Sequence, residues 1–80
     1  MIEKLLLNGN EVRIQVDDTF LRAKVWGYDS DYDLMVNLEI RKEGESPCYA
    51  MEELSCAVEE LEDRIRRSNK FKIWIGDEEI

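Results

Sequence analysis

The sequence predicts an α+β fold: an antiparallel sheet of about five strands (β-β-β-β-α-β) with one amphipathic helix packed on one face. Three features indicate this fold. Apolar residues recur at helical spacing in one long segment, they alternate with polar residues in several shorter ones, and turn-forming residues separate the segments. A length of 80 residues and an apolar content of 44% suit one domain that spans residues 1–80.

Residues 51–67 form the predicted helix. Four apolar residues follow one another at steps of four, three and four positions, so they share one stripe that should be buried. These residues are Leu54, Val58, Leu61 and Ile65. Acids dominate the start and arginines the end, which suits the helix dipole, and three acid–arginine pairs are spaced four residues apart. The pairs are Glu60–Arg64, Glu62–Arg66 and Asp63–Arg67.

The start of this helix has two interpretations. Ser46 and Pro47 could be its N-cap and first residue. Alternatively, residues 47–50 form a short extended segment and the helix begins near Met51. The second interpretation is favoured, because a helix from Pro47 would be about 33 Å long, against about 20 Å for the strands.

The chain before residue 17 is predicted to form a β-hairpin. Residues 2–7 are rich in apolar side chains, Asn8–Gly9 is a strong hairpin-turn signal, and residues 12–16 alternate between apolar and polar side chains. Asp17, Asp18 and Thr19 then form a turn by their composition.

A second hairpin is predicted from strands at residues 20–26 and 32–40. In the latter strand the alternate, inward positions are Tyr32, Leu34, Val36, Leu38 and Ile40. A last strand covers residues 71–75, before an acidic tail at residues 76–79. With the five predicted strands numbered along the chain, an antiparallel last strand gives the order 4-3-2-1-5, in which it lies beside residues 2–7. The alternative is a right-handed crossover that places it at the other edge, beside residues 32–40.

The residues offer little for catalysis, so we expect no enzyme activity and no cofactor. There is no histidine for a nucleophile–base pair and no glycine-rich phosphate loop. Asp29, Asp31 and Asp33 resemble the opening of a calcium loop, but Leu34 stands where that loop needs glycine and Ile40 where it needs a bidentate glutamate. The prediction is therefore a solvated turn without a metal.

Cysteine content and hydropathy point to a cytoplasmic protein. Cys48 and Cys56 are too few for a disulfide framework and are expected to be free thiols in a reducing compartment. The chain shows no signal peptide and no long apolar run, so secretion and membrane insertion have no support.

The net charge of −8, from 19 acids and 11 bases, favours a basic protein partner over nucleic acid or an anionic membrane. Two segments carry most of this charge: residues 17–33 have five acids and two bases, and residues 48–69 have six acids and three bases. Six acids in turns or outward helix positions are the predicted contacts: Asp29, Asp31, Asp33, Glu52, Glu59 and Asp63.

The sheet face opposite the helix is the second candidate surface. By strand parity it collects Phe20, Arg22, Lys24, Trp26, Met35, Lys72 and Trp74. These rings could simply pack across strands, or Trp26 and Trp74 could form a protein interface, since Trp, Met and Arg are enriched there. Aromatic and basic residues also suit a single-stranded nucleic-acid platform, which the net charge opposes.

These observations favour a small acidic protein-binding module. In size, acidity and lack of catalytic residues it resembles the small inhibitors that phages encode against host nucleic-acid enzymes, anti-CRISPR proteins among them. The resemblance is one of general character and covers no motif. It implies an acidic surface that imitates nucleic-acid phosphates and blocks a basic groove. The alternative is a structural or accessory subunit that forms a homodimer through the Trp-bearing sheet face.

Overall fold

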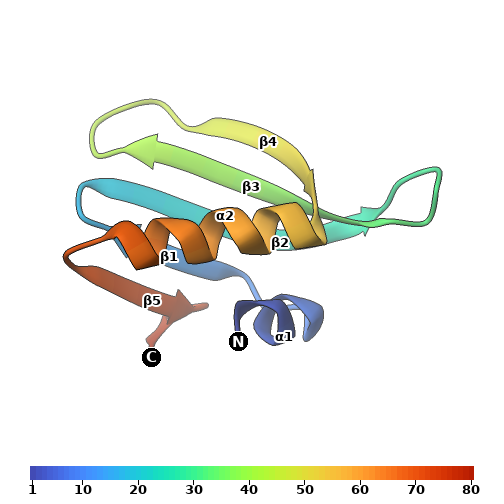
Figure 1. Cartoon of the computed structure of the whole chain (residues 1–80), viewed down its shortest axis with the longest axis horizontal. Helices are drawn as coiled ribbons and strands as arrows, with labels where there is room; N and C mark the ends of the chain where they lie inside the picture. Colours follow the sequence, from blue (N-terminus) through green and yellow to red (C-terminus); the bar gives the residue numbers. More distant parts are fainter.

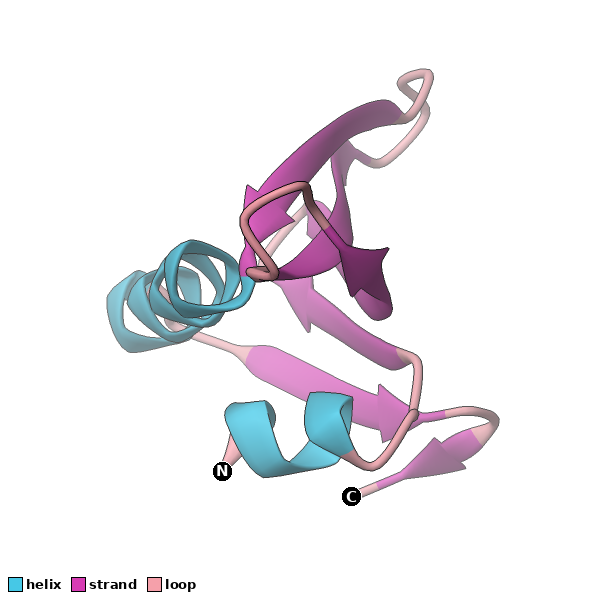
Figure 2. Ribbon diagram, turned by 90° about the vertical axis from the view of Figure 1, so that its right-hand side faces the viewer, coloured by secondary structure: helices cyan, strands magenta, loops and turns pink.

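The computed structural model describes residues 1–80 and contains two helices and six strands. In chain order they are α1 (Ile2–Leu7), β1 (Val12–Val16), β2 (Thr19–Tyr28), β3 (Leu34–Lys42), β4 (Cys48–Glu53), α2 (Leu54–Arg67), β5 (Phe71–Ile75) and β6 (Glu78–Glu79). All strands join one antiparallel sheet in the order β4-β3-β2-β1-β5-β6. Helix α2 lies across one face of the sheet and α1 lies near its lower edge (Figures 1 and 2). The predicted α+β class is confirmed, with six strands where about five were expected.

The predicted hairpin over residues 1–16 is wrong, because residues 2–7 form helix α1. Ile2 and Leu6, four positions apart, are both buried. The dipeptide Asn8–Gly9 ends this helix rather than turning a hairpin. Gly9 adopts φ +82, and its N–H donates a hydrogen bond to the carbonyl of Leu6. The N–H of Asn10 donates one to the carbonyl of Leu5. This bonding is the Schellman arrangement, which needs the same left-handed glycine as a hairpin turn.

The sheet order also differs from the predicted one at both sides. Since α1 is not a strand, β5 pairs directly with β1, so that Ile14 lies opposite Ile73. The edge beside β3 is taken by β4, which pairs Leu38 with Ala50 and excludes the crossover alternative. The acidic tail folds back after Gly76 and forms the short strand β6 against Trp74 and Ile75.

The β2–β3 hairpin was predicted with shorter strands and a different tip. Its strands reach Tyr28 and Leu34, and a bulge between Val25 and Gly27 accommodates Trp26 as an extra residue. Tyr32 was expected to point inward but is 86% exposed with φ +66, because it lies in the connecting loop. This loop is the part of the chain that projects farthest along the long axis of the molecule (Figure 1).

Helix α2 begins at Leu54, later than either predicted start, because the extended segment runs on as β4 to Glu53. The apolar stripe is confirmed as the side that packs on the core: Leu61 is fully buried, and Leu54, Val58 and Ile65 are partly buried against it. The core contains twelve buried residues: Ile2, Leu6, Val12, Ile14, Val16, Leu21, Ala23, Val36, Leu38, Ala57, Leu61 and Ile73. Leu34 and Ile40, predicted as inward positions, are only half-buried.

Two of the three predicted pairs along α2 form. The atoms Glu60 Oε1 and Arg64 Nε lie 2.9 Å apart, and Asp63 Oδ2 and Arg67 Nη2 lie 3.1 Å apart, whereas no ion pair joins Glu62 to Arg66. Neither helix has the length and apolar composition that crossing a membrane requires.

Candidate functional site

Both helices pack on the same side of the sheet, which leaves its other side, here called the open face, without a covering element. Cross-strand partners share a face in an antiparallel sheet, so the register assigns its side chains. One row crosses five strands and continues to Glu79 in β6. Its members are Tyr49, Glu39, Arg22, Arg13 and Trp74. A second row contains Arg41, Phe20, Gln15 and Lys72, and a third contains Met51, Asn37 and Lys24.

The fold concentrates basic residues on this open face. Its strands, with Glu11, hold five of the 11 bases, Arg13, Arg22, Lys24, Arg41 and Lys72, but only four of the 19 acids, Glu11, Glu39, Glu53 and Glu79. Asp77, which pairs with Arg13 from the turn before β6, makes five acids, so the face has no net charge and the rest of the chain carries −8. Glu53 and Glu79 lie on the two edge strands, so the middle of the face is more positive than this sum.

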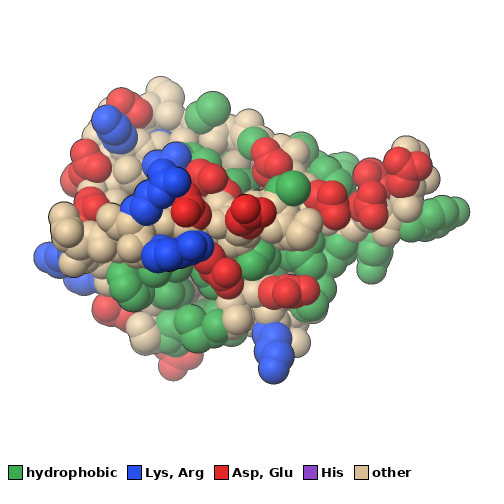
Figure 3. Space-filling model, viewed as in Figure 1, with side chains coloured by type: hydrophobic (Ala, Val, Ile, Leu, Met, Phe, Trp, Pro, Cys, Tyr) green, Lys and Arg blue, Asp and Glu red, His purple; other side chains and the backbone are tan.

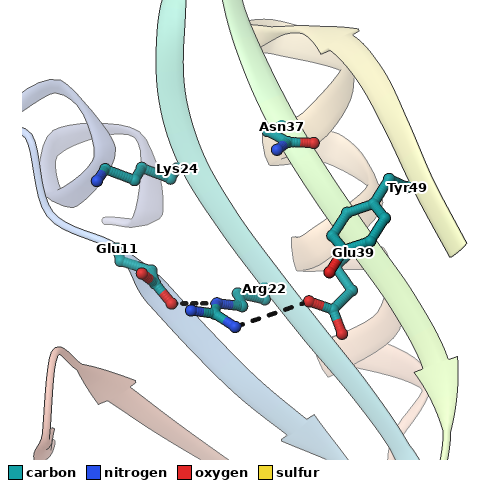
Figure 4. Close-up of a pocket in the computed structure, with 6 residues that line it drawn as sticks. All are labelled: Glu11, Arg22, Lys24, Asn37, Glu39 and Tyr49. Carbon is teal, nitrogen blue, oxygen red and sulfur yellow. Dashed lines mark hydrogen bonds and ion pairs between the residues drawn. The ribbon is translucent and has the colours of Figure 1, made fainter. Parts of the chain in front are cut away.

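A buried carboxylate organises the centre of the open face. Glu39 is only 7% exposed, and it lies between two arginines: its Oε1 is 3.2 Å from Arg41 Nε and its Oε2 is 3.9 Å from Arg22 Nη1. Arg22 Nε also donates a hydrogen bond to Glu11, so the guanidinium bridges two acids (Figure 4). This hydrogen bond, with the charges of Glu11 and Glu39, raises the pKa of Arg22.

The cations on this face differ in their other contacts. Arg13 donates a hydrogen bond to the carbonyl of Gly76, and its Nη2 lies 3.6 Å from Asp77, which is fully exposed. Arg41 places its guanidinium 5.6 Å from the centre of the Phe20 ring, and its Nε, although paired with Glu39, makes no hydrogen bond. No ion pair involves Lys24 or Lys72.

Two adjoining hollows open on this face. One, of about 250 Å³, is lined by Glu11, Arg22, Lys24, Asn37, Glu39 and Tyr49 (Figure 4). The other, of about 320 Å³, is lined mainly by three arginines and two rings, Arg13, Arg22, Arg41, Phe20 and Trp74. Cationic donors beside aromatic faces can bind planar anionic groups.

The predicted contacts Asp29, Asp31 and Asp33 come together at the projecting tip of the β2–β3 hairpin. One carboxylate oxygen from each lies within 4.8 Å of the others, and all three residues are exposed. Asp29 has a structural role as well: its Oδ1 accepts hydrogen bonds from the backbone N–H groups of Asp31, at 2.8 Å, and Asp33, at 2.9 Å. The three carboxylates could jointly hold a cation or a basic side chain.

The tip belongs to an acidic end of the molecule. Residues 25–40 and 43–63 contain no base, and most of the basic side chains on the helix side lie toward the opposite end, near the C-terminus of α2 (Figure 3). Exposed rings accompany the acids at the tip, where Tyr28 is 66% and Tyr32 86% exposed. The tip therefore offers charge and aromatic contacts together.

The structure separates the other predicted contacts. Glu52 was expected on the helix but lies on β4, half-buried opposite Val36, because that strand runs on to Glu53. Glu59 is exposed on α2 as expected, whereas Asp63 is half-buried and paired with Arg67. Trp74 lines the larger hollow of the open face, and Trp26 is 65% exposed at the bulge beside Lys24 and Asn37.

The predicted face did not include Arg13, Arg41 and Tyr49, nor the central acids Glu11 and Glu39. Arg13 sits at a polar position of the alternating 12–16 segment. That segment was correctly placed beside residues 20–26, but residues 2–7 were expected on its other side, where the structure has β5. Arg41 and Tyr49 lie in segments interpreted as loop or as undecided. Extending the alternation of residues 34–40 by one position would have found Arg41.

A comparison of the chain with protein-family models, with curated proteins and with solved structures finds no match. The function is therefore inferred from the two surfaces themselves.

Proposed function

We propose that this chain is a protein-binding module whose acidic end occupies a basic, nucleic-acid-binding surface of a partner protein. The contact is the hairpin tip, with Asp31 and Asp33 projecting, and the exposed acids of α2, such as Glu59. Such a module would act as an inhibitor of the kind that phages encode against host nucleic-acid enzymes, anti-CRISPR proteins among them. It would need neither catalytic residues nor a cofactor, and it would act in the cytoplasm, where those enzymes work.

The carboxylate cluster at the tip is the observation that supports this proposal. Three carboxylate oxygens lie within 4.8 Å of one another, on a segment without a single base from residue 25 to residue 40. Duplex DNA carries one negative charge per about 1.7 Å of its axis, so about 5 Å of duplex also holds three charges. A groove that binds DNA phosphates would therefore meet a comparable charge density at this tip.

The tip is also shaped before it meets a partner. The two hydrogen bonds to Asp29 Oδ1, together with backbone bonds from Asp29 to Asp33 and from Tyr32 to Asp29, fix the loop. A loop that is ordered in its bound form loses less conformational entropy on association. This supports a role for Asp29 in holding the loop and for Asp31 and Asp33 in contacting the partner.

Affinity capture with competing nucleic acid tests the proposal. The immobilised chain is exposed to a nuclease-treated bacterial lysate, and captured proteins are identified by mass spectrometry, with and without added duplex DNA. We expect nucleic-acid-binding proteins that are lost when DNA is added and when Asp31→Lys and Asp33→Lys are combined. The control is Glu43→Lys with Glu45→Lys, which makes the same change of charge in the exposed β3–β4 loop. Capture that neither DNA nor the tip variant reduces would contradict the proposal.

The alternative, a homodimer through the open face, is less well supported by the charges. A face-to-face pair would bring the five bases of one copy toward the five bases of the other, with Glu39 buried beneath its own arginines. Like charges brought together in this way disfavour association.

A further inference from the structure

We propose that the open face binds single-stranded nucleic acid, with phosphates on Lys24, Lys72, Arg13 and Arg41 and bases stacked on Tyr49 and Trp74. This activity goes beyond the proposed function, because it uses the side of the sheet that faces away from α2. The net charge of −8 argues against such binding for the chain as a whole. The fold, however, gathers nearly half of the bases on this one face.

The distance between the two faces reduces the effect of the remaining acids. The molecule measures 37 × 25 × 22 Å, so even its thinnest dimension exceeds twice the Debye length of about 8 Å at physiological salt. Acids on the far side of α2, such as Glu59, are therefore largely screened from a strand that lies on the open face. The acids that do lie near the centre are Glu11, which pairs with Arg22, and Glu39, which lies between Arg41 and Arg22.

The spacing of the side chains fits an extended strand. Tyr49 on β4 and Trp74 on β5 belong to the same row but are four strand spacings apart, roughly 19 Å at about 4.8 Å per strand. Several nucleotides are needed to cross that distance. Glu39, Arg22 and Arg13 lie between the two rings in this row, and Lys24 and Lys72 lie in the rows on either side. A strand across the face would thus meet a ring at each end and the cations between them.

Nucleic acid accounts for both components of this face better than other occupants do. An acidic peptide would use the cations but would leave the planar, exposed ring of Tyr49, 61% accessible, without a stacking partner. A second copy of the chain would add five more bases. Stacking on aromatic side chains together with cationic contacts to the backbone is the usual way in which open sheet faces bind single strands.

Fluorescence titration with labelled oligonucleotides tests the inference. Fluorescein-labelled oligothymidylate and oligouridylate of about ten nucleotides are followed by anisotropy, and the quenching of Trp26 and Trp74 is recorded in parallel. We expect dissociation constants on the order of 10⁻⁴ to 10⁻⁵ M at physiological salt and tighter binding at lower salt. Four phosphate contacts should give a slope of log K against log salt of about −3, since each contributes about −0.7 on single strands.

Matched variants separate the open face from the total charge. Lys24→Gln with Lys72→Gln removes two cations that hold no ion pair, so the fold should be kept and the slope should weaken by about 1.4. Lys4→Gln with Arg66→Gln makes the same change of charge on the helices and should leave binding unchanged. Tyr49→Leu should weaken binding fivefold or more, roughly the lower limit for one lost stacking contact.

Three results would overturn the inference. One is the absence of any anisotropy change up to millimolar protein at low salt. Another is an equal loss of binding in the variant that combines Lys24→Gln with Lys72→Gln and in the one that combines Lys4→Gln with Arg66→Gln. This result would mean that only the total charge matters. The third is a pair of results: a polyglutamate peptide of the same length displaces the oligonucleotide at the same concentration, and Tyr49→Leu does not weaken binding. The face would then be a site for acidic peptides.

Discussion

Replacing Leu61 with alanine tests the packing of α2 on the sheet, on which the placement of every surface residue depends. Leu61 is 0% exposed and lies in the middle of the apolar stripe. The substitution removes three carbon atoms, worth about 2.4 kcal/mol at about 0.8 kcal/mol per buried methylene. The cavity left behind raises the cost, and Leu→Ala changes in protein cores typically cost about 2–5 kcal/mol.

This loss is large relative to the stability of a chain of this length. At about 0.05–0.15 kcal/mol per residue, 80 residues give a free energy of unfolding of about 4–12 kcal/mol. A loss of about 3 kcal/mol should lower the Tm by roughly 12–24 °C for a small domain. We therefore expect Leu61→Ala to be markedly destabilised, and partly unfolded if the parent lies at the lower end of that range.

Urea denaturation followed by far-UV circular dichroism measures the change. The midpoint should fall while the m value is kept, because the surface exposed on unfolding is nearly the same. Glu62→Ala, at the next and exposed position of the same helix, is the matched control and should change the free energy by less than about 0.5 kcal/mol. An effect of Leu61→Ala as small as that of the control would mean that α2 does not pack on the sheet as described.

Three further predictions concern α1, the tip and self-association. Gly9→Ala should lower the free energy of unfolding by about 1–2 kcal/mol, because φ is +82 at Gly9 and a left-handed backbone costs an L-residue about that much. Thermal denaturation measures this change, and an unchanged Tm would argue against the Schellman end of α1. Asp29→Ala should speed amide exchange at Asp31 and Asp33 by roughly tenfold, because lost hydrogen bonds cost about 1 kcal/mol or more; unchanged protection would remove the structural role of Asp29. Sedimentation should show a monomer at all concentrations, and a dimer that Trp26→Ala or Trp74→Ala dissociates would instead establish the open face as a self-interface.

The elements with a long, regular pattern were predictable from the sequence. The stripe of α2 and the alternation of residues 12–16, 34–40 and 71–75 gave the helix and three central strands, because periodicity directly reflects which side is buried. The prediction for residues 2–7 failed because a segment of six residues is too short to show a decisive period. The turn signal Asn8–Gly9 also failed, because a left-handed glycine serves a helix end and a hairpin turn equally well.

The candidate surfaces were predictable only in part, and for a related reason. Asp29, Asp31 and Asp33 are neighbours in sequence, so their clustering at the tip follows from a turn alone. The open face depends on which strands pair, and the pairing of β5 with β1 brings Trp74 opposite Arg13. No local pattern encodes that contact. The total charge was also misleading about this face, since it does not report how the fold distributes bases and acids.

The rate of association with a captured partner tests the central claim most directly. Wild type and the combined Asp31→Lys and Asp33→Lys variant are compared by surface plasmon resonance over a range of salt concentrations. If the acidic end meets a basic surface, the association rate should fall as salt rises and should be lower for the variant, while the dissociation rate changes little. The account would be contradicted if the association rate were independent of salt, were unchanged in this variant and were lost only in Trp26→Ala or Trp74→Ala. That result would identify the open face as the contact.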